Sequence, residues 1–140
     1  MDREKAIDES KFSFGELREA LVERHSEETQ QKLERGRVAI AGLGGLGSNV
    51  AIALTRIGVG HLHLLDFDRV DLTNLNRQQY FLDQVGRYKT EALSETLQRI
   101  NPYLDIRFDT VKITDENIKE LFQEDEIVCE ALCRSTRLCW

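Results

Sequence analysis

The sequence contains no apolar run that approaches the roughly 18 residues needed by a membrane-spanning helix. Its first residues are polar and of mixed charge, which argues against a signal peptide. It also has no excess of basic residues: 19 Lys and Arg stand against 25 Asp and Glu, for a formal net charge of −6. This balance argues against a general binder of nucleic acid or of membrane surfaces. We therefore expect a cytoplasmic protein with no nucleic-acid and no membrane partner.

Cysteine is scarce, and its positions exclude some kinds of site. Cys129, Cys133 and Cys139 lie near the C-terminus, and no two of them form a C-x-x-C pair. A zinc site made by this chain alone is therefore not expected, and we predict no metal-ligating residues. An odd number of thiols in a cytoplasmic protein also argues against structural disulfides. We expect reduced thiols.

The sequence predicts two regions, a polar helical arm over residues 1–35 and a nucleotide-binding domain over residues 36–140. In the arm, apolar residues at i, i+3 and i+7 from Phe14 form a single stripe, as on a helix. Ser26 is the expected N-cap of a second short helix that begins near Glu27.

Beyond the arm, predicted strands and helices alternate in the order β-α-β-loop-α-β-α-β. This order is typical of the α/β class, and it predicts a Rossmann-like fold with a largely parallel sheet and flanking helices. The predicted strands span residues 37–42, 61–67, 104–113 and 125–132, and the predicted helices span residues 49–58, 84–100 and 114–122.

A glycine-rich turn lies between the first predicted strand and helix. Gly42, Gly44 and Gly47 satisfy G-x-G-x-x-G, and Gly45 adds a fourth glycine. Such a turn lets the backbone approach phosphate, which then lies at the helix N-terminus. Asp66 ends the second strand, where a carboxylate can accept hydrogen bonds from ribose hydroxyls. The motif alone does not distinguish NAD, FAD, S-adenosylmethionine and ATP, although the absence of G-x-x-x-x-G-K-[ST] excludes a Walker-type ATPase.

An arginine within a run of amides follows, in the segment "NLNRQQ". An NAD-linked dehydrogenase has no obvious need for this cluster, whereas phosphoryl or nucleotidyl transfer does. Arg77 can neutralise charge on a triphosphate, because a guanidinium fork suits phosphate oxygens. Asn74 can hold the α-phosphate or the ribose, and Lys89 can reach the phosphates from the start of a helix. The alternative interpretation is a solvated polar loop.

His61 and His63 alternate on the second predicted strand and should therefore point to the same face. We interpret them as packed or partly exposed strand residues. No Ser–His–Asp or Cys–His catalytic arrangement can be inferred from the spacing.

Taken together, "GLGGLG", "DFD", "NLNRQ" and "VGRYKTEAL" resemble the ThiF/MoeB/HesA family, the bacterial relatives of ubiquitin-activating enzymes. The resemblance covers residues from about 30 to 131. The wording "NLNRQQYF" is most like the ThiF branch, which activates the sulfur carrier ThiS in thiamine biosynthesis.

The resemblance implies an adenylyltransferase that uses ATP and Mg²⁺ to activate the C-terminal Gly-Gly carboxylate of a ubiquitin-like, ThiS-like carrier. It also implies a homodimer in which Arg77 reaches the nucleotide of the other subunit. Arg77 and Lys89 are the implied catalytic residues. The implied nucleotide-binding residues are Gly42, Gly44, Gly45, Gly47, Asp66, Asp68, Asn74, Arg77, Gln78 and Lys89.

The sequence departs from the family after "EDEIVCEA". The family continues with an aspartate that helps bind magnesium, and that position falls near Cys133, whose thiol does not replace a hard carboxylate. We therefore expect a C-terminally truncated chain, inactive as written, with its fourth strand at an exposed sheet edge. A non-catalytic nucleotide-binding or dimerisation module is the main alternative, and an NAD-linked oxidoreductase is a weaker one.

Overall fold

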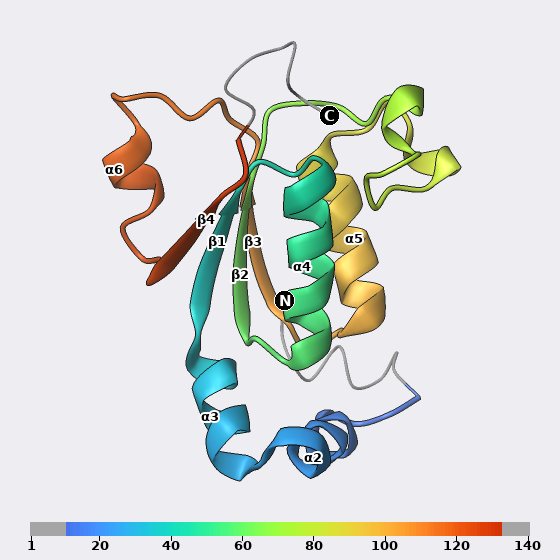
Figure 1. Ribbon diagram of the computed structural model, residues 1–140, viewed down its shortest axis with the longest axis vertical. Coiled ribbons are helices and arrows are strands. Elements are labelled where there is room, and N and C mark those ends of the chain that lie inside the picture. Colours follow the sequence, from blue (N-terminus) through green and yellow to red (C-terminus); the bar gives the residue numbers. More distant parts are fainter. Residues whose placement is uncertain (1–10, 133–140) are drawn as a thin grey trace.

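The computed structural model describes residues 11–132, and within them four parallel strands form a sheet in the order β3-β2-β1-β4. Figure 1 shows the Rossmann-like arrangement of this sheet and its helices, which confirms the predicted fold class. The elements are α2 (Phe14–His25), α3 (Glu27–Arg35), β1 (Arg37–Ala41), α4 (Gly45–Ile57), β2 (His61–Leu65), the 3-10 helices η1 (Leu72–Asn74) and η2 (Leu82–Gln84), α5 (Lys89–Ile100), β3 (Asp105–Asp109), α6 (Ile118–Leu121) and β4 (Ile127–Glu130).

The main hydrophobic core lies between the sheet and two helices. Helices α4 and α5 run side by side over one face, while α6 lies on the opposite side (Figure 1). Alternate residues of the central strands point toward α4 and α5, so Ile40 of β1 and Leu64 of β2 are completely buried in one cluster with Leu93 of α5. Each such side chain contributes about 1.5–3 kcal/mol of burial free energy. This core holds fixed the ends of the strands, where the glycine turn lies.

Both predicted helices of the arm are present at the end of the sheet where the strands begin (Figure 1). The predicted cap is confirmed, because the Ser26 side chain accepts a hydrogen bond from the Thr29 N–H at 3.3 Å. Arg18 joins the two helices, donating from Nε to Glu34 Oε1 at 2.6 Å and from Nη1 to Glu27 Oε2 at 2.9 Å. The arm therefore folds as a helical hairpin.

Some predicted element bounds are wrong. The helix predicted from Gln84 begins at Lys89, because Gly86 has a φ of +89°, a left-handed conformation that interrupts a helix. The strand predicted over residues 104–113 ends at Asp109, which pairs with Leu65, the last residue of β2. Its apolar alternation continues further along the chain, but the neighbouring strand does not.

The two strand histidines point to the same face of the sheet, as predicted, and that face is the one opposite α4 and α5. His63 is buried, with Nε2 2.6 Å from Asp109 Oδ2 and Nδ1 2.7 Å from Asp125 Oδ2. His61 is more exposed and contacts Asp105. A cavity of about 130 Å³ adjoins these histidines. His63 thereby links β2 to β3 and to the segment that enters β4.

Strand β4 lies at an edge of the sheet, as predicted. Ile127 and Val128 are 58% and 44% exposed, so this edge presents apolar side chains. Cys129 is a free thiol, whereas Cys133 and Cys139 lie outside the described residues. Between residues 11 and 132, no helix is long and apolar enough to cross a membrane.

Candidate nucleotide-binding site

The glycine turn joins the end of β1 to the start of α4 in a conformation that requires two of its glycines. Gly42 has a φ of +95°, in the left-handed region that side chains disfavour. A Cβ on Gly47 would lie 1.7 Å from the Gly42 carbonyl oxygen, so the helix approaches the strand more closely than any other residue permits. Helix α4 begins at Gly45, earlier than the predicted position 49. Its first backbone N–H groups therefore lie at the turn.

Asp66 lies directly behind this turn and holds its backbone. Its Oδ2 accepts a hydrogen bond from the Leu43 N–H at 2.7 Å, and its Oδ1 accepts one from the Asp68 N–H at 2.8 Å. The carboxylate thus fixes the loop in addition to its predicted role toward ribose. Each carboxylate oxygen has a second lone pair, so these bonds leave capacity for a hydroxyl donor.

The segment of residues 74–80, which we call the amide–arginine loop, docks on the start of α4 through Ser48 and Asn49, neither of which was predicted as a site residue. Ser48 Oγ donates to the Gly44 carbonyl at 2.6 Å and accepts from the Gln79 N–H at 3.1 Å. Asn49 accepts from Gln79 Nε2 at 2.9 Å and donates to the Arg77 carbonyl at 3.2 Å. These bonds bring two predicted parts of the site together. Ser48 and Asn49 could have been predicted as site residues from one feature of the sequence, their position immediately after the glycine motif.

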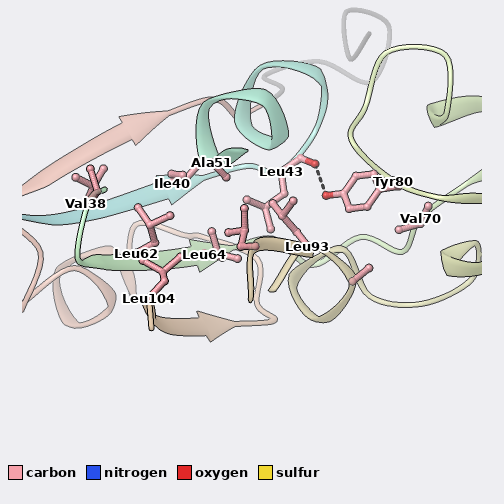
Figure 2. Close-up of a cluster of buried hydrophobic side chains, with 13 residues drawn as sticks. Val38, Ile40, Leu43, Ala51, Leu62, Leu64, Val70, Tyr80, Leu93 and Leu104 are labelled. Atoms are coloured by element: carbon pink, nitrogen blue, oxygen red, sulfur yellow. Dashed lines mark hydrogen bonds between the residues drawn. The ribbon is translucent and has the colours of Figure 1, made fainter. Parts of the chain in front are cut away.

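Tyr80 ties the same loop to the middle of the turn. Its hydroxyl donates to the Leu43 carbonyl at 2.6 Å, and the ring is buried in the main core (Figure 2). Burial, with a smaller contribution from the negative charge of Asp66, raises the pKa of Tyr80 above its ordinary value. The hydroxyl is therefore protonated and able to donate at neutral pH.

The side-chain oxygen of Gln78 is buried without a hydrogen-bond donor from the described residues. The side chain is 7% exposed, and its Nε2 lies 3.6 Å from the position that a Cβ on Gly44 would occupy. Its Oε1 is buried and has no hydrogen-bond partner among the described residues. Buried acceptors are nearly always satisfied, so an external donor is expected beside the turn.

Asn74 and Arg77 are occupied within their own loop. Asn74 Oδ1 accepts from the Asp71 N–H at 2.8 Å and so caps η1. Arg77 Nη1 donates to Asn76 Oδ1 at 2.9 Å and to the Thr73 carbonyl at 3.4 Å. To contact a phosphate, the Arg77 Nη1 would have to leave these two exposed partners.

Lys89 adds a cation to this edge of the sheet from the first residue of α5. Its backbone N–H donates to the Asp68 carbonyl at 3.0 Å, and the residue is 6% exposed. Hydrogen bonds from Thr73, followed by the smaller effect of the Lys89 charge, hold the pKa of Asp71 below its ordinary value. The Lys89 charge therefore lies near Asp71, the residue that precedes η1.

The described part of the chain contains no group of three or more His, Cys, Asp or Glu side chains that could hold a metal ion. The position near Cys133, where the resemblance places a magnesium-binding aspartate, lies outside the described residues.

Comparison with known proteins gives relatives in both sequence and structure. The chain is 41% identical over 102 residues to the molybdopterin-synthase adenylyltransferase of Escherichia coli, which covers 72% of this chain and 41% of that protein. It is 45% identical over 84 residues to ubiquitin-like modifier-activating enzyme 5 of Arabidopsis thaliana, covering 60% of this chain and 20% of the relative. The chain therefore spans less than half the length of these proteins.

A solved structure agrees. The E. coli tRNA N6-threonylcarbamoyladenosine dehydratase TcdA, in complex with ATP, has a TM-score of 0.78 and 30% identity, over 81% of this chain and 48% of that one. The ThiF family profile matches residues 17–138, which is most of the sequence. The chain belongs to the ThiF family.

Proposed function

We propose that this chain provides the ATP-binding part of an adenylyltransferase that activates the C-terminal carboxylate of a ubiquitin-like carrier. The observation that carries the proposal is the buried, unpartnered Gln78 Oε1 beside the N-terminus of α4. A nucleotide in the glycine turn would place hydroxyl and amino donors next to this acceptor. The adenylyltransferase names of several relatives support the same reaction class.

The site fits a nucleotide in chemistry. The backbone N–H groups at the start of α4 and the helix dipole favour a phosphate group. Asp66, at the end of the neighbouring strand, offers lone pairs to ribose hydroxyls and would repel a 2′-phosphate. Lys89 and Arg77 contribute positive charge at the same edge. Solved relatives in complex with ATP and with AMP support ATP over NAD.

The proposed step is a displacement at the α-phosphorus of ATP. A carrier carboxylate oxygen forms a bond to this phosphorus, the bond to the β-phosphate oxygen breaks, and pyrophosphate leaves with that electron pair. No proton transfer is required. The protein's contribution is to orient the two reactants and to stabilise negative charge on the phosphates through the turn amides, Lys89 and Arg77.

Magnesium would accompany the triphosphate, because Mg²⁺ at such sites is held by substrate phosphates and one or two carboxylates. Asp68 is the exposed carboxylate that follows Asp66 at this edge. We propose it as the carboxylate that faces the ion.

A protein partner would cover apolar side chains around the site. Leu46 in the first turn of α4, Leu72 in η1 and Leu82 in η2 are 76%, 62% and 72% exposed. Exposed apolar groups of this kind around a site are typical of interaction surfaces. A ThiS-like carrier of thiamine biosynthesis and a second copy of this chain, with Arg77 reaching across, are the partners we propose.

The test is ATP–pyrophosphate exchange with labelled pyrophosphate, the chain, Mg²⁺ and a ThiS-type carrier that ends in Gly-Gly. A carrier lacking these two glycines is the matched control. We expect exchange with the intact carrier and none with the shortened one. Binding of ATP without exchange would instead identify the chain as a non-catalytic nucleotide-binding module, and binding of NAD without ATP would identify a dinucleotide site.

A further inference from the structure

The glycine turn contains three successive peptide groups, and each of them forms a hydrogen bond with a different side chain. Asp66 accepts from the Leu43 N–H, Tyr80 donates to the Leu43 carbonyl, and Ser48 donates to the Gly44 carbonyl. These three side chains come from the end of β2, from the amide–arginine loop and from α4. Of the three side chains, only Asp66 is among the residues that the resemblance to the ThiF family implied, and the middle contact, from Tyr80, joins the loop to the centre of the turn.

We propose that Tyr80 is a positioning residue that aims the Gly44 N–H at the phosphate of the bound nucleotide, an inference that rests on the proposed function. The peptide bonds in the described residues are trans, so the carbonyl of Leu43 and the N–H of Gly44 point in opposite directions. The Tyr80 hydroxyl holds that carbonyl on the loop side (Figure 2). The Gly44 N–H therefore points away from Tyr80.

The neighbouring peptides show that the same geometry operates at the next step of the turn. Because Asp66 takes the Leu43 N–H, the Gly42 carbonyl points the opposite way, and it is found against Gly47 at the start of α4. In each of these peptide groups, the carbonyl and the following N–H therefore point in opposite directions. Fixing the Leu43 carbonyl fixes the next donor in the turn.

The middle peptide needs such a constraint because glycine flanks it. Leu43 stands between Gly42 and Gly44, and glycine gives the backbone access to conformations that other residues exclude. A rotation of the Leu43–Gly44 peptide would turn the Gly44 N–H away from a phosphate. It would also leave the Leu43 carbonyl, on a completely buried residue, without the Tyr80 hydroxyl.

The test compares Tyr80→Phe with Tyr103→Phe. Both tyrosines are 6% exposed, and both donate to a backbone carbonyl, Tyr80 to Leu43 at 2.6 Å and Tyr103 to Phe12 at 2.8 Å. Tyr103 contacts the arm and so controls for the general loss of a buried hydroxyl. Each variant of the full chain is measured for its ATP, AMP and adenosine affinity by calorimetry, and for the residual dipolar coupling of the Gly44 N–H by NMR.

We expect Tyr80→Phe to weaken ATP and AMP binding by about three- to tenfold, the value of one hydrogen bond, and to leave adenosine affinity within about twofold. The Gly44 coupling should change in the variant without nucleotide. Tyr103→Phe should change neither. Equal behaviour of the two variants, or equal loss for ATP, AMP and adenosine, would overturn the assignment.

The NMR measurement separates this inference from the proposed function. If the wild-type chain binds no adenine nucleotide, the proposed function fails, and so does the role of Tyr80 toward phosphate. If the chain binds ATP but the Gly44 coupling is the same in Tyr80→Phe as in wild type, the proposed function survives and the positioning role of Tyr80 is refuted.

Discussion

Replacing Gly47 by alanine tests whether the close approach of α4 to β1 limits the stability of this fold. Two effects oppose each other. Alanine favours a helix over glycine by about 1 kcal/mol. Against this, the new Cβ would lie 1.7 Å from the Gly42 carbonyl oxygen and 2.8 Å from its carbonyl carbon, both of them backbone atoms. The helix must therefore move away from the strand by more than 1 Å. A backbone displacement of this size should cost as much free energy as the most severe cases of overpacking.

The steric effect should win. Overpacking costs about 1–3 kcal/mol where side chains can adjust, and more where backbone must move. We therefore expect Gly47→Ala to lower the free energy of unfolding by about 3 kcal/mol or more, a large part of the 5–15 kcal/mol typical of such domains. Urea denaturation followed by circular dichroism measures this difference as a fall in the midpoint.

Gly15→Ala is the matched control. Gly15 also lies in the first turn of a helix, but it is exposed, and its Cβ would meet the Ser13 Oγ at an ordinary 3.8 Å. There we expect no loss of stability, and a gain of up to about 1 kcal/mol. Equal or higher stability for Gly47→Ala relative to wild type would refute the packing argument, because helix propensity alone would then explain both variants.

Three further changes test the site and the opposite face of the sheet. Because folding raises the pKa of the Tyr80 hydroxyl, this residue stabilises the folded protein at neutral pH, and that stabilisation is lost as pH rises above the ordinary tyrosine pKa of 10.0. Tyr80→Phe should therefore flatten the fall in the free energy of unfolding above pH 10, measured by urea denaturation at each pH. Asp66→Asn should lower the free energy of unfolding by about 1–3 kcal/mol, because the amide NH2 that replaces one carboxylate oxygen cannot accept the backbone N–H which that oxygen holds; an unchanged urea midpoint would contradict this. Asp125→Asn, which weakens a buried contact with His63, should cost about 3 kcal/mol, whereas the exposed Asp105→Asn should cost less than about 1 kcal/mol; equal thermal midpoints would show that burial does not matter here.

The sequence predicted the positions that depend on local backbone requirements. Gly42 and Gly47 occupy positions that a Cβ cannot tolerate, so their spacing carries structural information by itself. Asp66 could be placed at the end of the second strand because the apolar residues of a buried strand stop there in the sequence. The family could therefore be inferred before the structure was known.

The contacts that assemble the site could not be predicted in this way. The bonds from Gln79 to Ser48 and from Tyr80 to Leu43 join residues 31 and 37 positions apart. Serine and tyrosine hydroxyls that bind backbone atoms leave no periodic pattern. The start of α5 was missed because the residues before Lys89 remain compatible with a helix until the conformation of the preceding glycine is known.

The most direct test of the central claim is a ¹H–¹⁵N NMR titration of the full chain with Mg-ATP and, separately, with NAD. The account predicts that ATP shifts the backbone amides of residues 43–47 and the side-chain amide of Gln78 at concentrations where NAD shifts neither. Shifts produced by NAD alone, or ATP shifts confined to the face around His63, would contradict the assignment of this edge of the sheet as an ATP site.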